Sequence, residues 1–117
     1  MDKATKIWNR AALSGSVDQL RQGDVALAAI LRAHGMVMNG GLYHAIEDLS
    51  EAELDAAIRG YRYFSLNPIA ELFESARSQS NLPDADAQYA KTIPDDGAIE
   101  IRFSQILQAS PEQFCEI

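Results

Sequence analysis

A capping box at Ser50 and Glu53 is the strongest local folding signal in the chain. The serine hydroxyl can accept a hydrogen bond from the amide of residue 53, and the glutamate can accept one from the amide of residue 50, so the pair opens an α-helix. The apolar residues that follow recur every three or four positions: Leu54, Ala57, Ile58, Tyr61 and Phe64. This is the period of a helix with one buried side. The segment therefore predicts a helix that needs other elements to cover its apolar face.

The same period predicts four more helices around the capping box. They cover residues 3–13, 24–38, 42–49 and 67 to about 79. Asp24 is expected to cap the amides at the start of the second, and Asn67 followed by Pro68 has the sequence of a cap and a first helical residue. The apolar stripes together predict a core that contains Trp8, Leu31, Leu54, Ile58, Phe73 and Phe103.

Glycine and proline mark where the helices should end. Asn39-Gly40-Gly41 follows the second helix, and we expect positive φ at Gly40 or Gly41, because an unbroken helix would carry two glycines at a cost of about 1 kcal/mol each. Residues 82–97 are rich in proline, aspartate and alanine, and residues 94–97 form a turn signal. This segment is interpreted as a connection between helices.

Residues 99–107 fit two patterns. Ile99, Ile101 and Phe103 alternate with charged residues as in a strand, whereas Ile99, Phe103 and Ile106 fall on one side of a helix. A single strand would have no sheet to join, which favours the helix. The chain is therefore predicted to be all-α, a single compact, bundle-like domain over residues 1–117 with five to seven helices.

Length and cysteine content indicate how the chain is stabilised and in which cellular compartment it is expected. A chain of 117 residues is large enough to bury a core without metal or disulfide support. Cys115 is the single cysteine, which excludes a disulfide within the chain and suits a reducing compartment. No segment has the pattern of a secretory signal or of a membrane span. We therefore expect a cytoplasmic protein that does not bind membranes.

The acidic charge is unevenly distributed along the chain. The net charge is -7; residues 1–32 hold five bases and three acids, and residues 33–117 hold five bases and fourteen acids, a balance of -9. A field of this sign repels nucleic acid and anionic lipid and speeds encounter with basic proteins. Two interpretations stay open: the acidity serves a partner, or it serves solubility alone.

Five carboxylates gather between residues 47 and 55 with no base among them: Glu47, Asp48, Glu51, Glu53 and Asp55. Part of this is structural, because acids in a first helical turn interact favourably with the helix dipole. Glu53 belongs to the capping box, and Asp55 can pair with Arg59 four residues on. Glu47, Asp48, Glu51 and Asp55 are the candidate residues for binding a basic partner; the alternative is a solvated helix face.

No catalytic site or cofactor is expected. His44 and Glu47 are one helical turn apart, with Asp48 beside them, but a metal would need further ligands and His34 is the only other histidine. The serines occupy positions typical of helix caps and turns, and Cys115 lies near the end of the chain. Neither residue type is found beside a histidine in a motif typical of a catalytic nucleophile. The glycines at 40 and 41 lack the lysine and hydroxyl residue of a phosphate-binding loop. An enzyme and a bound metal are both disfavoured.

From residue 34 to residue 76 the order of features resembles a bacterial family of small domains of largely unknown function, whose best-known member is a DNA mimic. The resemblance rests on a helix ending in Asn39-Gly40-Gly41, Leu42-Tyr43 opening the next helix, an acid-rich stretch, a helix ending in Gly60-Tyr61, and a helix begun by Pro68. It implies an all-helical fold, frequent homodimers, and an acidic face that occupies the DNA-binding surface of another protein.

Three functional hypotheses follow. The first is an acidic protein-binding module, with mimicry of DNA as its specific form; the second is an immunity or neutraliser protein for a basic toxin; the third is an accessory protein of another kind. A domain of this length has a face roughly 35 Å long, and duplex DNA of that length carries about 20 phosphate charges. Imitating one side takes about ten carboxylates on one face, which favours a dimer over one protomer.

Overall fold

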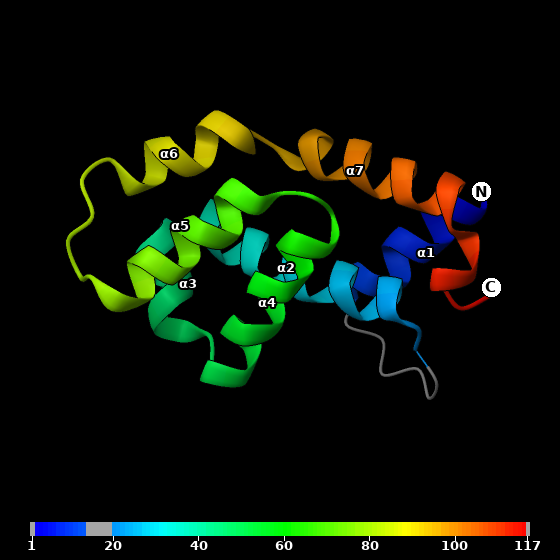
Figure 1. The fold of residues 1–117 in the computed structure, drawn as a ribbon, viewed down its shortest axis with the longest axis horizontal. Helices are drawn as coiled ribbons and strands as arrows, with labels where there is room; N and C mark the ends of the chain where they lie inside the picture. The colour runs from blue at the N-terminus through cyan, green and yellow to red at the C-terminus, as the bar shows by residue number, and fades with distance from the viewer. Residues whose placement is uncertain (1, 14–19, 117) are drawn as a thin grey trace.

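The computed structural model describes residues 2–13 and 20–116, and within these ranges every regular element is helical (Figure 1). The elements, in chain order, are α1 (Lys3–Ala12), α2 (Gln22–Gly40), α3 (Leu42–Asp48), α4 (Glu51–Tyr63), α5 (Asn67–Ser78), α6 (Ala85–Thr92), α7 (Asp96–Ala109) and the short 3-10 helix η1 (Pro111–Gln113). The all-α fold is thus confirmed. The region around Ile99, for which a strand was the alternative, lies inside α7.

The long helix α2 is the centre of the fold. It packs against α1, α3 and α4, and α4 in turn packs against α5. α6 and α7 run along one side of this bundle, and the two ends of the chain lie together beside α1 (Figure 1). Gly60 lets α2 and α4 approach closely: a Cβ there would lie 2.7 Å from Ile30 Cγ2 and 2.8 Å from the carbonyl oxygen of Ala26.

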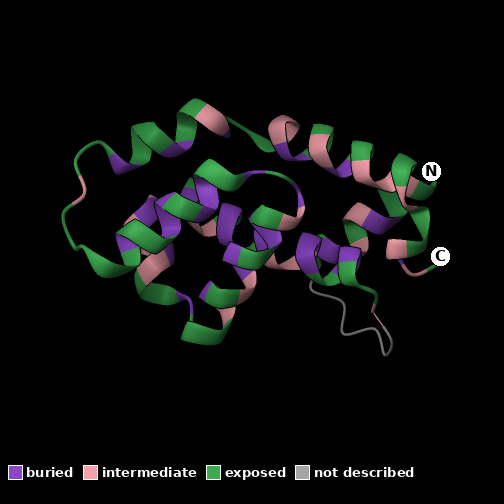
Figure 2. Ribbon diagram, in the orientation of Figure 1, coloured by how far each residue is buried: buried purple, intermediate pink, exposed green. Residues whose placement is uncertain are grey.

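The core is one cluster to which every α-helix contributes (Figure 2). Four of the predicted core residues are buried: Leu54, Ile58, Phe73 and Phe103. Trp8 and Leu31 are half-buried and pack against the outside of the core, so their placement inside it was wrong. Tyr89 and Phe114 are fully buried and were not predicted. Both belong to parts of the chain interpreted as a connection or a terminus.

The junction of α2 and α3 turns at Gly41. Its φ is +93°, which confirms the expected positive φ, and its amide donates to the carbonyl of Val37 at 2.7 Å. Asn39 and Gly40 lie inside α2, so the helix ends two residues later than predicted. The amide of Leu42 donates to Oδ1 of Asp86 at 2.7 Å, so a residue of α6 caps the start of α3. This long-range cap explains how α3 can resume at once.

The helix starts are partly as expected. The capping box of α4 is present: Ser50 Oγ accepts from the amide of Glu53 at 3.1 Å, and Glu53 accepts from the amide of Ser50 at 2.9 Å. Asp24 accepts from the amide of Arg21 at 3.2 Å, but as the third residue of a helix that starts earlier, at Gln22. Asn67 is not a cap, since α5 already begins at Asn67 and Leu66 precedes it without a side-chain cap.

The segment interpreted as a connection contains a helix of its own. α6 spans eight residues and follows Asp84, whose φ of +53° is left-handed. The predicted turn at residues 94–97 becomes the start of α7, where Asp95 accepts from the amide of Gly97 at 2.9 Å. No helix in the described part of the chain is long and apolar enough to cross a membrane.

Candidate partner-binding surface

The predicted partner-binding residues lie at the junction of α3 and α4. Glu47 and Asp48 end α3, Glu51 opens α4, and Asp55 follows one turn later. All four side chains are exposed. Only Leu49 and the capping residue Ser50 separate the two helices, and Leu49 is buried. The buried leucine and the capping box therefore fix the backbone that carries the carboxylates.

Bases from distant parts of the chain reach into this acidic segment. Arg32 on α2 lies 3.3 Å from Glu53, and Arg77 on α5 lies 2.7 Å from Asp55. The expected pairing of Asp55 with Arg59 was therefore wrong. Arg77 also donates to the carbonyl oxygen of Glu51 at 3.2 Å.

His44 Nδ1 lies 3.5 Å from Asp48, so this histidine faces an acid on its own helix. Among the described residues the side chains of Glu47 and Glu51 take part in no ion pair, and these two are the free charges of the segment. No group of three or more metal-binding side chains occurs in the described ranges. The amide of Ser50 lowers the pKa of Glu53 below its ordinary value, as a hydrogen bond to the charged form does.

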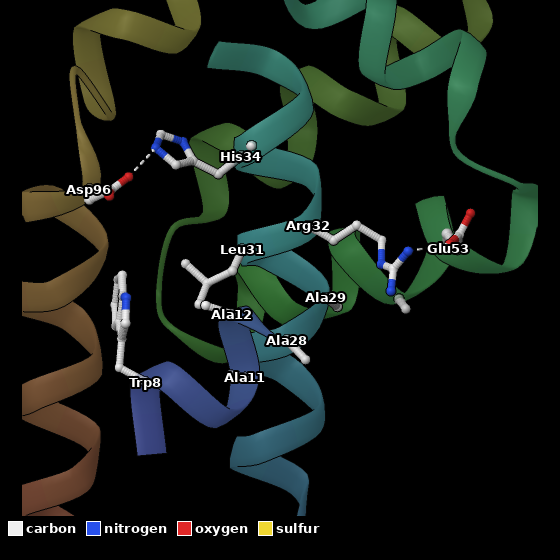
Figure 3. Close-up of a pocket in the computed structure, with 12 residues that line it drawn as sticks. Trp8, Ala11, Ala12, Ala28, Ala29, Leu31, Arg32, His34, Glu53 and Asp96 are labelled. Carbon is white, nitrogen blue, oxygen red and sulfur yellow. Dashed lines mark hydrogen bonds and ion pairs between the residues drawn. The ribbon is translucent and has the colours of Figure 1, made fainter. Parts of the chain in front are cut away.

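A half-open groove of about 640 Å³ lies beside this segment, over the outward face of α2 (Figure 3). Its floor is made of small residues, and Glu53 belongs both to its wall and to the acidic segment. On the far side, Leu31 and Trp8 approach each other, and His34 points toward Asp96 (Figure 3). The groove therefore joins the acidic junction to the space between α1 and α7.

A series of hydrogen-bonded polar side chains, buried except for Asp96, ties α2, α4, α6 and α7 together behind the groove. His34 Nδ1 lies 2.8 Å from the hydroxyl of Tyr89, which lies 2.9 Å from the hydroxyl of Tyr61. His34 Nε2 lies 2.8 Å from Asp96. Burial raises the pKa of both tyrosines well above the ordinary value. Both hydroxyls thus stay protonated. The hydrogen-bonded side chains support the wall of the groove.

Comparison with known proteins assigns the family. A family model described as DMP19-like protein matches residues 18–116. The chain belongs to the DMP19-like protein family. No curated protein and no solved structure gave a significant match. In this DMP19-like chain the match spans α2 to η1 with the whole acidic junction, and α1 lies outside it.

The acidic residues of this DMP19-like protein can be found from the sequence, whereas the residues that organise them cannot. Arg32 and Arg77 are about 20 positions away from the carboxylates they contact, so local charge counting could not pair them. The spacing of four residues suggested Arg59 as a partner for Asp55 within α4, but Asp55 pairs with Arg77 of α5 instead. The capping role of Asp86 could not be predicted locally either, because Asp86 accepts its hydrogen bond from the amide of Leu42, 44 positions earlier in the sequence.

Proposed function

We propose that this DMP19-like protein is an acidic protein-binding module that occupies the nucleic-acid-binding surface of a basic partner. The family to which it belongs is named for a DNA mimic protein. The observation that carries the proposal is the surplus of exposed acid within the matched region. Of the fourteen acids after residue 32, all except half-exposed Glu53 are exposed.

Ion pairs leave a large part of this charge free. Glu53, Asp55 and Glu74 contact arginines, and Asp48 and Asp96 contact histidines. The remaining nine acids of this region take part in no ion pair among the described residues: Glu47, Glu51, Glu71, Asp84, Asp86, Asp95, Glu100, Glu112 and Glu116. Capping alone does not account for that many carboxylates: of these nine, and within the described part of the chain, only Asp86 and Asp95 accept backbone hydrogen bonds through their side chains.

Size and charge together favour two copies acting jointly. The long axis measures 42 Å, and duplex DNA of that length carries about 25 phosphate charges, of which about 12 face one side. The nine free carboxylates of residues 33–117 fall short of that number. A homodimer with a joined acidic surface would reach it. The acidic surplus thus supports a role in binding, with a DNA-binding protein as the partner.

The proposal is tested by recovering partners from the source cell and measuring their binding at low and high salt. Binding should weaken steeply as salt rises past about 0.15 M, where exposed charges are screened beyond about 8 Å. The variant Glu47→Gln, Asp48→Asn, Glu51→Gln should slow association with the recovered partner, since charge at an interface mainly sets the on-rate. Glu53 is left unchanged because it closes the capping box.

A charge-matched control separates the junction from the overall field. The variant Glu71→Gln, Glu100→Gln, Glu112→Gln removes three free charges outside the junction. It should slow association less than the junction variant. Equal effects would assign binding to net charge alone, and an unchanged affinity in the junction variant would refute the proposed surface. Displacement of DNA from the partner distinguishes mimicry from binding elsewhere on it.

A further inference from the structure

Helix α1 is a basic amphipathic helix docked on an otherwise acidic protein. Its ten residues include Lys3, Lys6 and Arg10 and no acid. Ile7 is fully buried in the core, and the ring of Trp8 lies 5.8 Å from that of Phe103, centroid to centroid. One side of α1 thus carries apolar anchors, and Lys3 and Lys6 are exposed.

Arg10 occupies an acceptor site that the rest of the chain builds. Its guanidinium donates to Asp24 Oδ1 at 2.6 Å, to the carbonyl of Cys115 at 2.9 Å and to that of Glu116 at 3.3 Å. The side chain of Asp24 is 3% exposed and that of Arg10 is 14% exposed. A buried carboxylate with two carbonyls beside it suits the planar fork of an arginine rather than a lysine.

The acceptor site is held in place without α1. Asp24 Oδ2 accepts from the amide of Cys115 at 2.6 Å and from that of Arg21 at 3.2 Å. Arg21 donates to the carbonyls of Glu112 and Phe114, both at 3.2 Å, and Phe114 is buried. These contacts join the first turn of α2 to the C-terminal segment, so the receptor for Arg10 is complete apart from the arginine itself.

The residues that match the family model include the acceptor site for Arg10 but not α1. Asp24, Phe103, Cys115 and Glu116 lie within the matched residues 18–116, whereas every residue of α1 lies outside them. Trp8 also borders two open grooves, the one over α2 and a second between α1 and α7 of about 1060 Å³. Helix α1 therefore leaves open space on both sides of Trp8.

We propose that the surface of α2, α7 and the C-terminal segment that holds α1 is a docking site for a basic amphipathic helix of a protein partner, and that α1 occupies it in cis. The partner helix places an arginine on Asp24 and an aromatic or aliphatic anchor against Phe103. Charge favours such an occupant, because residues 33–117 have a balance of -9. The proposal rests on the proposed function only in taking the partner to be basic.

Tethering gives α1 an advantage that a partner must overcome. A segment linked to its site acts at an effective concentration of about millimolar, so the intact chain should bind an added helix weakly. Loosening α1 should open the site without changing the receptor. That difference between the intact and loosened chain is the signature of an occupant in cis.

The test uses a labelled peptide with the sequence of residues 2–13 as the probe and the full chain as the receptor. Fluorescence anisotropy would compare the intact chain with the variants Arg10→Ala and Trp8→Ala. Each variant should bind the peptide at least about tenfold more tightly than the intact chain, because truncating one side of a buried pair or anchor weakens α1. Trp8→Ala leaves no buried charge unpaired, so it covers the case in which Arg10→Ala fails to fold.

Peptide variants supply the matched control. A peptide carrying Arg10→Ala should lose binding to the Trp8→Ala chain, whereas one carrying Lys6→Ala, with the same change of charge, should bind within about twofold of the original. Equal losses from the two peptides would mean nonspecific attraction and would overturn the site. Equally weak binding of the peptide by all three chains would also overturn the site. A dimer that forms in the variants and excludes the peptide would overturn the proposal by assigning the site to a second copy of this chain.

Failure of this proposal is distinguishable from failure of the proposed function. Made in the Trp8→Ala chain, the junction changes at Glu47, Asp48 and Glu51 leave Asp24 in place, and the resulting chain should bind the peptide as tightly as Trp8→Ala alone. If the peptide binds but the junction variant retains full affinity for the recovered partner, the docking site stands and the acidic junction does not. If the junction variant loses the partner but no chain binds the peptide, the reverse holds.

Discussion

The imidazole Nε2 of His34, near the middle of α2, lies 2.8 Å from Oδ1 of Asp96, the first residue of α7. Through its other nitrogen the same ring contacts Tyr89 of α6. One buried histidine therefore holds two helices that follow it by more than 50 residues. The aromatic contact of Tyr61 with Phe73, at 5.2 Å between centroids, continues this link into α5.

Replacing Tyr89 by phenylalanine should test the buried polar chain. The change removes the shared partner of His34 Nδ1 and of the Tyr61 hydroxyl, leaving two buried polar groups without a hydrogen bond. Each such group costs about 1–3 kcal/mol. Urea unfolding should therefore show a loss of at least about 2 kcal/mol, and Tyr61→Phe, which leaves the contact of Tyr89 with His34, should lose less. A Tyr89→Phe chain as stable as its parent would refute this account.

The same tyrosines predict how stability changes at alkaline pH. Burial raises the pKa of Tyr61 and of Tyr89 above the ordinary 10.0, so the folded chain keeps both protons where the unfolded chain loses them. Above about pH 10 the folded state thus binds more protons, and the free energy of unfolding falls as pH rises. Urea midpoints measured at about pH 9 and 11 should show this fall. The fall should be smaller in Tyr89→Phe.

Exchanging glycines in α2 and at its end should have opposite effects. Gly41→Ala forces a side chain into φ of +93° and places Cβ 3.0 Å from Asp86, which caps α3, so a loss of more than about 1 kcal/mol is expected. Gly35 is helical, and a Cβ there meets nothing within 4 Å. Gly35→Ala should stabilise by about 0.5–1 kcal/mol. Thermal melting of both variants checks this: the melting temperature should fall for Gly41→Ala and rise for Gly35→Ala. Shifts in the same direction would contradict the prediction.

Gly60→Ala should report on the closeness of α2 and α4. The new Cβ would lie 2.8 Å from the carbonyl oxygen of Ala26, which is backbone and cannot move aside alone. Overpacking of this kind costs about 1–3 kcal/mol. Urea unfolding should show that loss even though alanine is the better helix former. A stabilised Gly60→Ala variant would mean that the helices can separate without cost.

Local signals in the sequence were enough to predict most of the fold. The capping box at Ser50 and Glu53, the apolar stripe around Leu54 and the positive φ before α3 all depend on residues within a few positions of one another. α6 escaped prediction because it is short and follows a left-handed Asp84, so packing of Tyr89 against Tyr61 defines it more than any local pattern does.

The candidate surface was less predictable for a related reason. Its carboxylates could be found by counting along the sequence, but their neutralisation by Arg32 and Arg77 depends on how α2 and α5 pack on α4. The same holds for Asp24, expected as a cap, whose main contacts come from Arg10 and from the amide of Cys115 at the far end of the chain. Contacts of this range exist only once the helices have packed.

Removing Arg77 should strengthen the acidic junction while costing little stability. Arg77 contacts the carboxylate of Asp55 and the carbonyl of Glu51, so Arg77→Gln frees one charge and removes a base from the candidate surface. Exposed ion pairs contribute about 0–1 kcal/mol, and urea unfolding should fall within that range. Association with a partner recovered at low salt should become faster, because charge at an interface steers encounter.

Lys91→Gln removes an equal charge from exposed Lys91 on α6 and should change the association rate less. Stopped-flow measurements of the three chains decide the matter: equal acceleration by both variants would assign the effect to net charge, and unchanged rates in Arg77→Gln would exclude the junction from the encounter.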